Sequence, residues 1–293
     1  MVDSKKTKIN FMKYIDTHAH VNFNAYKEDA DEVIKRSLEK GVGVVNVGSQ
    51  YSTSVRAVEM AHRFENVWAV IGIHPLHLRK QNLSYQDSSE LEATEIKTSG
   101  EEFDYKKYLE LAKDEKVVAI GEVGLDYHHF EEGDDVEKLK QQQQEVLLKA
   151  IQLANEINKP IMLHCWDAYP DLLEILKKYP VEKKGIVHSF VGGYKTAKKF
   201  IELGYKIGLN GVITYTDDFS RLIKEISLED IVLETDCPYL TPVPHKGERN
   251  EPYMVELVAK KISEVLEIDI EDVKKITSGN AIRVFGIKKE SLL

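Results

Sequence analysis

The sequence predicts an α/β fold, a single-domain (β/α)8 TIM barrel, and three observations support this prediction. The chain has 293 residues, and a barrel of this kind typically needs about 250. Short apolar runs rich in Val and Ile alternate with longer segments of helical period, as in a parallel sheet built from βα units. Polar side chains that can bind a divalent metal recur where these apolar runs end.

Eight apolar runs are predicted to be the strands of the barrel. Strands that are buried on both faces read as nearly continuous aliphatic segments, and these runs have that character. In chain order they are residues 14–18, 43–48, 67–73, 117–123, 160–164, 185–188, 205–209 and 231–235.

The predicted helices lie between these strands. In segment 137–157, for example, Leu139, Val146, Ala150 and Ala154 recur at helical spacing. The Gln run at 141–144 within it is interpreted as a solvated helix face. The predicted helices are residues 28–40, 137–157, 167–179, 194–203, 217–226 and 253–266, with one or two more after residue 269.

Segment 76–102 interrupts the alternation after the third strand. It is rich in Ser, Glu and Gln and has no sustained apolar period. A loop of this length is usually either a functional lid or a flexible excursion, and the sequence favours neither. We therefore expect one domain over residues 1–293 that carries this segment as an insertion.

The composition indicates the class of protein and limits how it could bind nucleic acid. The hydrophobic content of 42% and the charged content of 30% are typical of a soluble globular protein. A net charge of −9 disfavours a broad basic face for duplex DNA, although bound divalent cations can supply local positive charge.

Two cysteines, Cys165 and Cys237, are too few for a disulfide framework. The N-terminus has no apolar signal region and no stretch is long enough to span a bilayer, so we expect a cytoplasmic protein without membrane contact.

The first strand ends in a pair of histidines, His18 and His20. Strand alternation places Asp16, His18 and His20 on one face that is directed into the barrel, where both imidazoles can bind one cation. Asp16 lies one pleat deeper and is a candidate acceptor that fixes a histidine tautomer. The alternative is a chance pair of polar residues at a strand end.

The fourth strand buries a carboxylate, Glu122, among aliphatic residues. An unpaired charge there would be strongly disfavoured, so Glu122 needs a partner. The partner is either a pair of metal ions bridged by its two oxygens or a basic residue of the barrel. No Lys or Arg lies in the late part of any predicted strand, which favours the metal.

Three further candidates end the fifth, sixth and eighth strands. His164 and His188 end consecutive strands and could form a second cation site, although either could instead be an ordinary core histidine. Asp236 ends the eighth strand, which adjoins the first in a closed barrel, so it can bind metal beside His18 and His20 and accept a proton from water. Glu234 shares its face and either supports the ligands or only forms a buried hydrogen bond. Imidazole and carboxylate ligands suit Zn, Mn or Mg.

Seven motifs, in chain order DTHAH, GIHP, GEVGLDYH, LHCWDA, VHSF, ETDCPYLTP and RNEP, cover nearly the whole chain. With them the sequence resembles the TatD family of metal-dependent deoxyribonucleases, among the amidohydrolase-like TIM-barrel hydrolases. The resemblance implies a site of two divalent metal ions with Glu122 as the bridge and Asp236 as the base. His18, His20 and Asp236 would hold one ion, and His164 and His188 the other.

The resemblance also implies a substrate and its contacts. His74 of GIHP and Arg249 of RNEP are expected to face the substrate phosphate. We expect exonucleolytic cleavage of single-stranded or frayed DNA that is bound locally and weakly, and a monomer is compatible with the sequence. One departure is Trp166, which stands where the family usually has arginine. It either removes a phosphate contact, stacks on a base or packs under the insertion.

Two other functions are compatible with the same fold. A hydrolase of amide, ester or aminoacyl-tRNA substrates could use the same barrel and metals. Relatives of that kind often bridge their metals through a modified lysine on the fourth strand, but here Lys116 lies at the wrong end of that strand. A binding protein without catalysis is disfavoured by the complete set of ligands.

Overall fold

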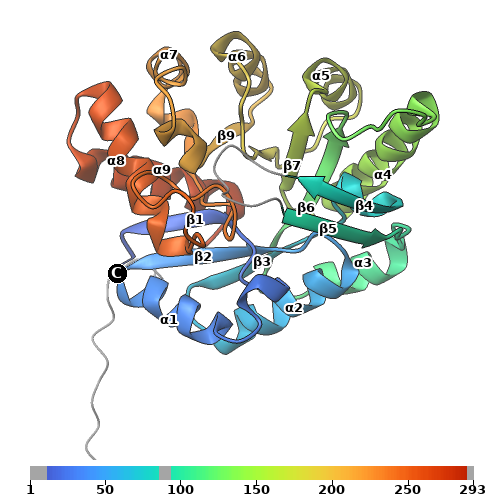
Figure 1. Ribbon diagram of the computed structural model, residues 1–293, viewed down its shortest axis with the longest axis horizontal. Helices are drawn as coiled ribbons and strands as arrows, with labels where there is room; N and C mark the ends of the chain where they lie inside the picture. Colours follow the sequence, from blue (N-terminus) through green and yellow to red (C-terminus); the bar gives the residue numbers. More distant parts are fainter. Residues whose placement is uncertain (1–11, 86–93, 289–293) are drawn as a thin grey trace, which may run out of the picture.

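The computed structural model describes residues 12–85 and 94–288 (Figure 1). Eight parallel strands form a nearly closed barrel in the order β1-β2-β3-β6-β7-β8-β9-β10, and helices surround it. The predicted (β/α)8 TIM barrel is thereby confirmed. The strands are β1 Tyr14–Ala19, β2 Val42–Val47, β3 Val67–Ile71, β6 Val117–Asp126, β7 Ile161–Trp166, β8 Gly185–Val187, β9 Lys206–Leu209 and β10 Ile231–Leu233.

The barrel closes where β1 meets the segment that follows β10. The backbone N–H of Asp236 donates to the His18 carbonyl at 2.8 Å, and that of His20 donates to the Cys237 carbonyl at 2.9 Å. Ala19 and Cys237 form an isolated parallel bridge at this seam. The closure therefore places Asp236 beside both histidines of the first strand.

Helices cover the outside of the sheet. They are α1 Ala30–Glu39, α2 Tyr51–Arg63, α3 Tyr105–Ala112, α4 Val136–Glu156, α5 Tyr169–Lys178, α6 Tyr194–Glu202, α7 Ser220–Glu225, α8 Val255–Leu266 and α9 Ile270–Phe285. In the described residues, short 3-10 helices occur between the strands and helices: η1 Asn24–Tyr26, η2 Pro75–Leu78, η3 Gly211–Thr214, η4 Leu228–Asp230 and η5 Pro252–Met254. The apolar faces of these helices and the outer face of the sheet form the larger core.

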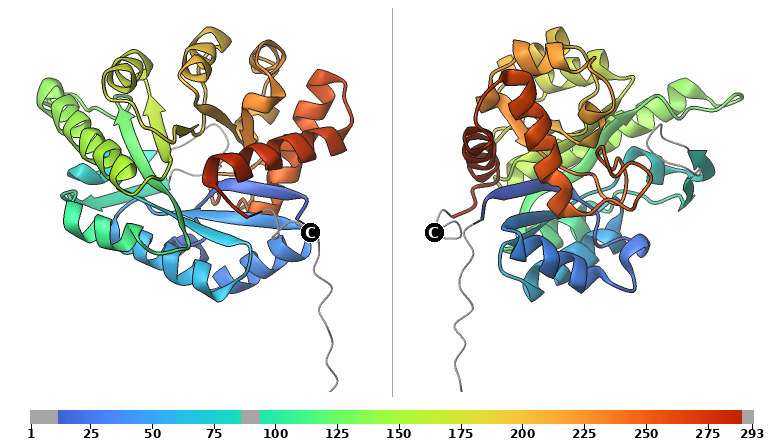
Figure 2. Two further views of the ribbon diagram at one scale, coloured as in Figure 1. Left: turned by 180° about the vertical axis from the view of Figure 1, so that it is seen from behind. Right: turned by 60° about the vertical axis from the view of Figure 1, so that its left-hand side comes forward.

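A second, smaller core fills the barrel and closes its lower end. Ile15, Val70 and Met162 of the strands belong to this cluster together with Phe285 of α9. The helix α9 lies beside β1 (Figure 2). This end is sealed by apolar side chains. The opposite rim, where the strands have their carboxyl ends, is left for polar residues, as in other TIM barrels.

The segment between β3 and β6 contains secondary structure that the sequence did not predict. It contains η2 and an antiparallel hairpin, β4 Lys80–Tyr85 and β5 Thr94–Ser99, which forms a sheet separate from the barrel (Figure 1). Residues 86–93 of the predicted insertion lie outside the described residues, as do the N-terminal residues 1–11 and the end of the tail, 289–293. A role as lid or flexible loop stays a prediction. In the described part of the chain, no helix is both long and apolar enough to cross a membrane.

Candidate metal centre

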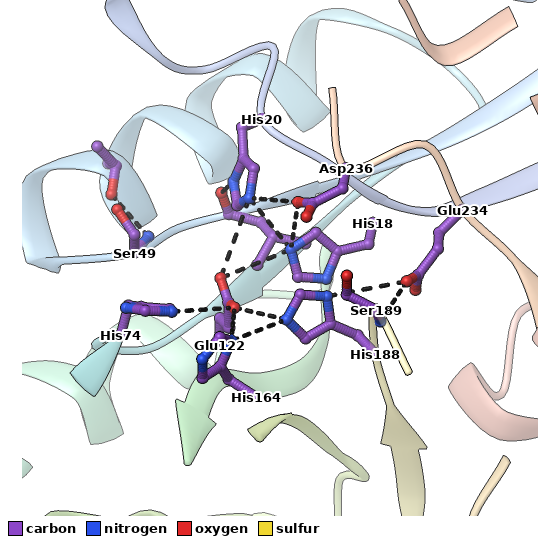
Figure 3. A network of polar contacts seen from close by, with 12 residues as sticks. His18, His20, Ser49, His74, Glu122, His164, His188, Ser189, Glu234 and Asp236 are labelled. Carbon is purple, nitrogen blue, oxygen red and sulfur yellow. Dashed lines mark hydrogen bonds and ion pairs between the residues drawn. The ribbon is translucent and has the colours of Figure 1, made fainter. Parts of the chain in front are cut away.

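The six predicted ligands converge at the carboxyl-terminal rim of the barrel (Figure 3). His18 lies in β1, Glu122 in β6 and His164 in β7, whereas His20 and His188 directly follow β1 and β8, and Asp236 lies three residues after the end of β10. Parallel strands in a closed barrel bring their carboxyl ends to one rim, and this brings together residues that are far apart in the sequence.

His18, His20 and Asp236 form the first group of possible ligands. The Nε2 atoms of His18 and His20 are 3.1 Å apart. Asp236 Oδ1 lies 3.6 Å from His18 Nε2 and 3.3 Å from His20 Nε2. Ligand atoms of a tetrahedral ion with bonds of about 2.1 Å lie roughly 3.4 Å apart, so this triangle fits one cation. The Nδ1 of His20 lies 2.9 Å from the Val47 carbonyl and must carry a proton to donate to it. The Nε2 of neutral His20 therefore keeps its lone pair for the metal.

Glu122, His164 and His188 form the second group. Glu122 Oε1 lies 3.1 Å from His164 Nδ1 and 2.6 Å from His188 Nε2, and these two nitrogens are 3.3 Å apart. The other oxygen of Glu122, Oε2, lies 3.6 Å from His18 Nε2 in the first group. The two oxygens of one carboxylate thus face two separate sets of nitrogen atoms.

Both carboxylates at the centre are held in their ionised form. Burial opposes ionisation of Glu122, but the surrounding imidazoles, including His188 and His164, outweigh it and hold the pKa well below its usual range. Burial also opposes ionisation of Asp236, yet its contacts with the His20 and His18 rings lower its pKa to about 2. In the described residues, the ion-pair partners of Glu122 are histidines and not Lys or Arg.

Asp126, at the end of β6, supports the second group and was not predicted from the sequence. His164 Nε2 donates to Asp126 Oδ2 at 3.0 Å, so a neutral His164 ring has its lone pair on Nδ1, which faces Glu122. Asp126 also accepts from His129 Nδ1 at 2.9 Å. Burial opposes its ionisation, but His129 and His164 hold its pKa far below the usual range. The sequence does contain one indication of this role: Asp126 is a carboxylate at the end of an apolar run, four residues after Glu122 and therefore on the same face of the strand.

Gln143 of α4 in turn fixes the backbone of Asp126. Its Oε1 accepts from the Asp126 N–H at 2.8 Å, and its Nε2 donates to the Asp126 carbonyl at 2.9 Å. The prediction of a solvated Gln face at 141–144 is therefore wrong for Gln143, which is buried. Exposed Gln141 fits that prediction.

Asp16 and Glu234, the predicted supporting residues, are both fully buried beneath the rim. Asp16 accepts from the Thr235 hydroxyl at 2.6 Å and from the backbone N–H groups of Thr235 and His18. None of these donors is an imidazole ring, because Thr235 donates to both carboxylate oxygens across the seam, so the predicted contact with a histidine ring is not found among the described residues. Burial raises the pKa of Asp16 to about 8. Glu234 Oε1 accepts from the Ser189 N–H at 2.5 Å and lies 3.9 Å from His188 Nδ1.

His74 points a hydrogen-bond donor toward the centre. Its Nδ1 accepts from the Leu76 backbone N–H at 3.1 Å, so neutral His74 carries its proton on Nε2, 3.5 Å from Glu122 Oε1. Burial holds the pKa of His74 well below its usual value, which keeps the ring neutral. Although His74, Asp126 and His164 are close enough to form a third metal-binding group, this tautomer makes His74 a donor and not a ligand.

A pocket opens above the two groups, and it contains some of the predicted substrate contacts. His74 and Trp166 are among the residues that line it. Arg249 is not among them: its guanidinium binds both oxygens of Asp29 and the Ala25 carbonyl, because a carboxylate fits the guanidinium in a bidentate pair. The substrate-contact roles of His74, Trp166 and Arg249 stay predictions.

Comparisons with known proteins agree with this geometry. Residues 15–286 match the family model described as TatD related DNase. The chain is 38% identical to the uncharacterized metal-dependent hydrolase YabD of Bacillus subtilis over 276 residues, which is 93% of this chain and 98% of that protein. It is 30% identical to the putative deoxyribonuclease TATDN3 of Mus musculus over 281 residues, 95% of this chain and 90% of that protein. The crystal structure of YjjV, a TatD homolog from Escherichia coli K12, superposes with a TM-score of 0.81 at 26% identity, covering 94% of this chain and 99% of that one. The chain therefore belongs to the TatD family of metal-dependent hydrolases.

Proposed function

We propose that this protein is a deoxyribonuclease that uses two divalent metal ions to hydrolyse phosphodiester bonds at single-stranded or frayed DNA ends. The observation that carries the proposal is the position of Glu122, whose two oxygens face two separate groups of nitrogen ligands inside one pocket. The family description and the name of the mouse relative both refer to deoxyribonucleases, which supports DNA as the substrate.

The residues divide between two ion sites. His18, His20 and Asp236 would hold one ion, His164 and His188 the other, and Glu122 would reach both. Bound Mg, Mn or Zn ions would offset the developing charge on the phosphate and lower the pKa of water.

Asp236 is the better placed of the two central carboxylates to accept a proton from the attacking water. Its side chain is 15% exposed, compared with 5% for Glu122, and it lines the pocket in its ionised form. A base must be within hydrogen-bond reach of the proton that it takes. Glu122 is enclosed by histidines and is therefore assigned to holding the ions.

His74 is assigned to the phosphate. Its Nε2–H points toward the centre and its ring stays neutral, so it can donate a hydrogen bond to a phosphate oxygen as negative charge develops there. Among the described residues that line the pocket, none is Lys or Arg. Attraction of the phosphate to this pocket therefore depends on the ions, which supports weak, local binding of DNA.

A cleavage assay with end-labelled DNA tests the proposal. Purified protein is incubated with single-stranded DNA labelled at the 5′ or the 3′ end in Mg, Mn or Zn, beside blunt duplex of the same sequence. We expect stepwise shortening of the single strand from one end. Glu122→Gln should lower the rate by at least about a hundredfold, as for loss of a central electrostatic group. Glu145→Gln, an exposed position on α4, is the matched control.

Three outcomes would count against parts of the proposal. Absence of cleavage by the wild type, or undiminished cleavage by Glu122→Gln, would contradict the metal-dependent nuclease. Internal fragments at early times would contradict cleavage from an end. Hydrolysis of ester or aminoacyl-tRNA substrates, with none of DNA, would assign the site to the alternative hydrolase.

A further inference from the structure

Phe23, Trp166 and Tyr239 are aromatic residues that line the pocket, and two of them, Trp166 and Phe23, lie on opposite sides of the candidate metal centre. Trp166 ends β7, two residues after His164, and Phe23 lies just beyond β1, three residues after His20. Around the closed barrel, β1 and β7 are separated by β2, β3 and β6 on one side and by β8, β9 and β10 on the other. The two rings thus flank the ligand groups, which lie between them at the rim.

Both rings are held in place by neighbouring side chains. The Phe23 ring lies parallel to the His20 ring, with centroids 4.2 Å apart and planes inclined by 19°. The Trp166 ring lies parallel to His128 at 4.3 Å and 14°, and His129 meets it edge-on at 5.2 Å. His128 is paired with Asp167, and His129 with Asp126. Side chains that are already fixed lose little freedom when a ligand binds, which favours binding.

The rest of the pocket wall matches a flat apolar group better than a bare phosphate chain. Leu76, Val212 and Leu240 line the wall, and Val191 is 44% exposed beside them. None of the described residues in the lining is Lys or Arg. Stacking of a nucleobase on an aromatic side chain is sequence-tolerant and strengthens binding roughly 5- to 150-fold per base.

We infer that Trp166 and Phe23 are two base-stacking positions for the unpaired nucleotides on either side of the scissile phosphate of DNA. The inference rests on the proposed function and adds the substrate feature that the site selects. A phosphate at the metal centre would place one nucleoside toward Trp166 and the other toward Phe23. Bases in a duplex are already stacked on their neighbours, so the substrate must be unpaired over at least these two nucleotides.

A binding experiment without turnover tests this inference. The wild-type protein is titrated in Mn with two fluorescein-labelled single strands of equal length that carry cleavage-resistant phosphorothioate links, oligothymidylate and a chain of abasic deoxyribose units, and anisotropy is measured. Because the two strands share the phosphorothioate backbone, the expected tenfold or greater preference for oligothymidylate reports the bases alone. Trp166→Leu should remove most of the preference, and Trp166→Phe should retain it. Tyr179→Leu, an exposed aromatic outside the pocket, is the matched control.

Fluorescence provides a second readout that does not require the leucine variant to fold. The chain has two tryptophans, so Trp68→Phe leaves Trp166 as the single reporter. Its emission should be quenched by oligothymidylate and not by the abasic strand. Equal affinity for the two strands, or a preference that survives in both Trp166→Leu and Phe23→Leu, would overturn the inference. Absence of DNA cleavage by the wild type would instead contradict the nuclease, and a base preference would then still support the stacking positions.

Discussion

At the scale of single residues, hydrogen bonds determine which nitrogen each histidine offers to the centre. His20 donates from Nδ1 to the Val47 carbonyl and offers Nε2, whereas His164 donates from Nε2 to Asp126 and offers Nδ1. Acceptors of this kind fix the tautomer and orientation of a metal-binding imidazole. Asp126 is therefore a positioning residue for the proposed second ion site.

Replacement of Asp126 by Asn tests this role. The amide removes the negative charge and presents either an oxygen or an NH2 group to the two imidazoles, so His164 loses its preference for the proton on Nε2. We expect metal affinity to fall by roughly 10- to 100-fold, as for other partners of metal ligands. Isothermal titration with Mn measures the affinity and the number of ions bound.

The control for Asp126→Asn is Asp114→Asn, which removes a histidine–carboxylate contact between His62 and Asp114 far from the pocket. It should leave both affinity and stoichiometry unchanged. Equal metal binding by Asp126→Asn and the wild type would contradict the positioning role.

The sequence could predict the six ligands but not the residues that orient them. Each of the six lies within two residues of the end of a predicted strand, and barrel topology carries such positions to one rim without further information. Asp126 and His129 act through contacts between β6, β7 and the following loop, which depend on register and side-chain direction. Arg249 shows the same limit, because nothing in its motif indicates that Asp29, 220 residues away, occupies its guanidinium.

At the scale of elements, strands were easier to predict than helices. All eight barrel strands were predicted within a few residues, because burial on both faces leaves a continuous aliphatic run. Helices α2 and α3 were missed. The buried face of α2 consists largely of small residues such as Ser54, Ala57 and Ala61 and has few of the large aliphatic side chains by which the other helices were identified, and α3 buries only Tyr108 and Ala112. The β4–β5 hairpin was missed because its two strands form their backbone hydrogen bonds with each other, and this pairing does not require an alternating apolar pattern.

The contact between α4 and β6 is a second element-level feature with a measurable consequence. Gln143→Leu preserves the size of the buried side chain but leaves the N–H and the carbonyl of Asp126 without their α4 partner. Each buried group left unsatisfied costs about 1–3 kcal/mol, so we expect the free energy of unfolding to fall by roughly 2–5 kcal/mol. Urea denaturation followed by circular dichroism measures this change.

Gln141→Leu, the same substitution on the exposed face of α4, should change the free energy of unfolding by no more than about 0.5 kcal/mol. A similar, small loss for both variants would show that the Gln143 side chain does not fix β6.

At the scale of the whole molecule, the two ends of the barrel are held in different ways. The lower end is closed by apolar packing of α9 against the inner strand residues. The upper rim instead gathers Glu122, Asp236 and Asp126 with several imidazoles, and its ligands lie in or shortly after β1, β6, β7, β8 and β10. Ions bound there would connect strands all around the barrel, so metal binding should be coupled to folding.

Thermal unfolding with and without metal tests this coupling. An ion that binds only the folded state, present at a hundred times its dissociation constant, stabilises that state by about 2.7 kcal/mol. Since about 1 kcal/mol shifts the Tm of a chain of this size by roughly 2 °C, addition of Mn to chelator-treated protein should raise the Tm by about 5 °C for each site filled. His188→Asn, which removes one ligand from the second group only, should keep the shift due to the first group and lose the other. Calorimetry that finds the same Tm in Mn and in EDTA would contradict the coupling, because six ligands contributed from around the barrel cannot bind an ion without stabilising the fold that assembles them.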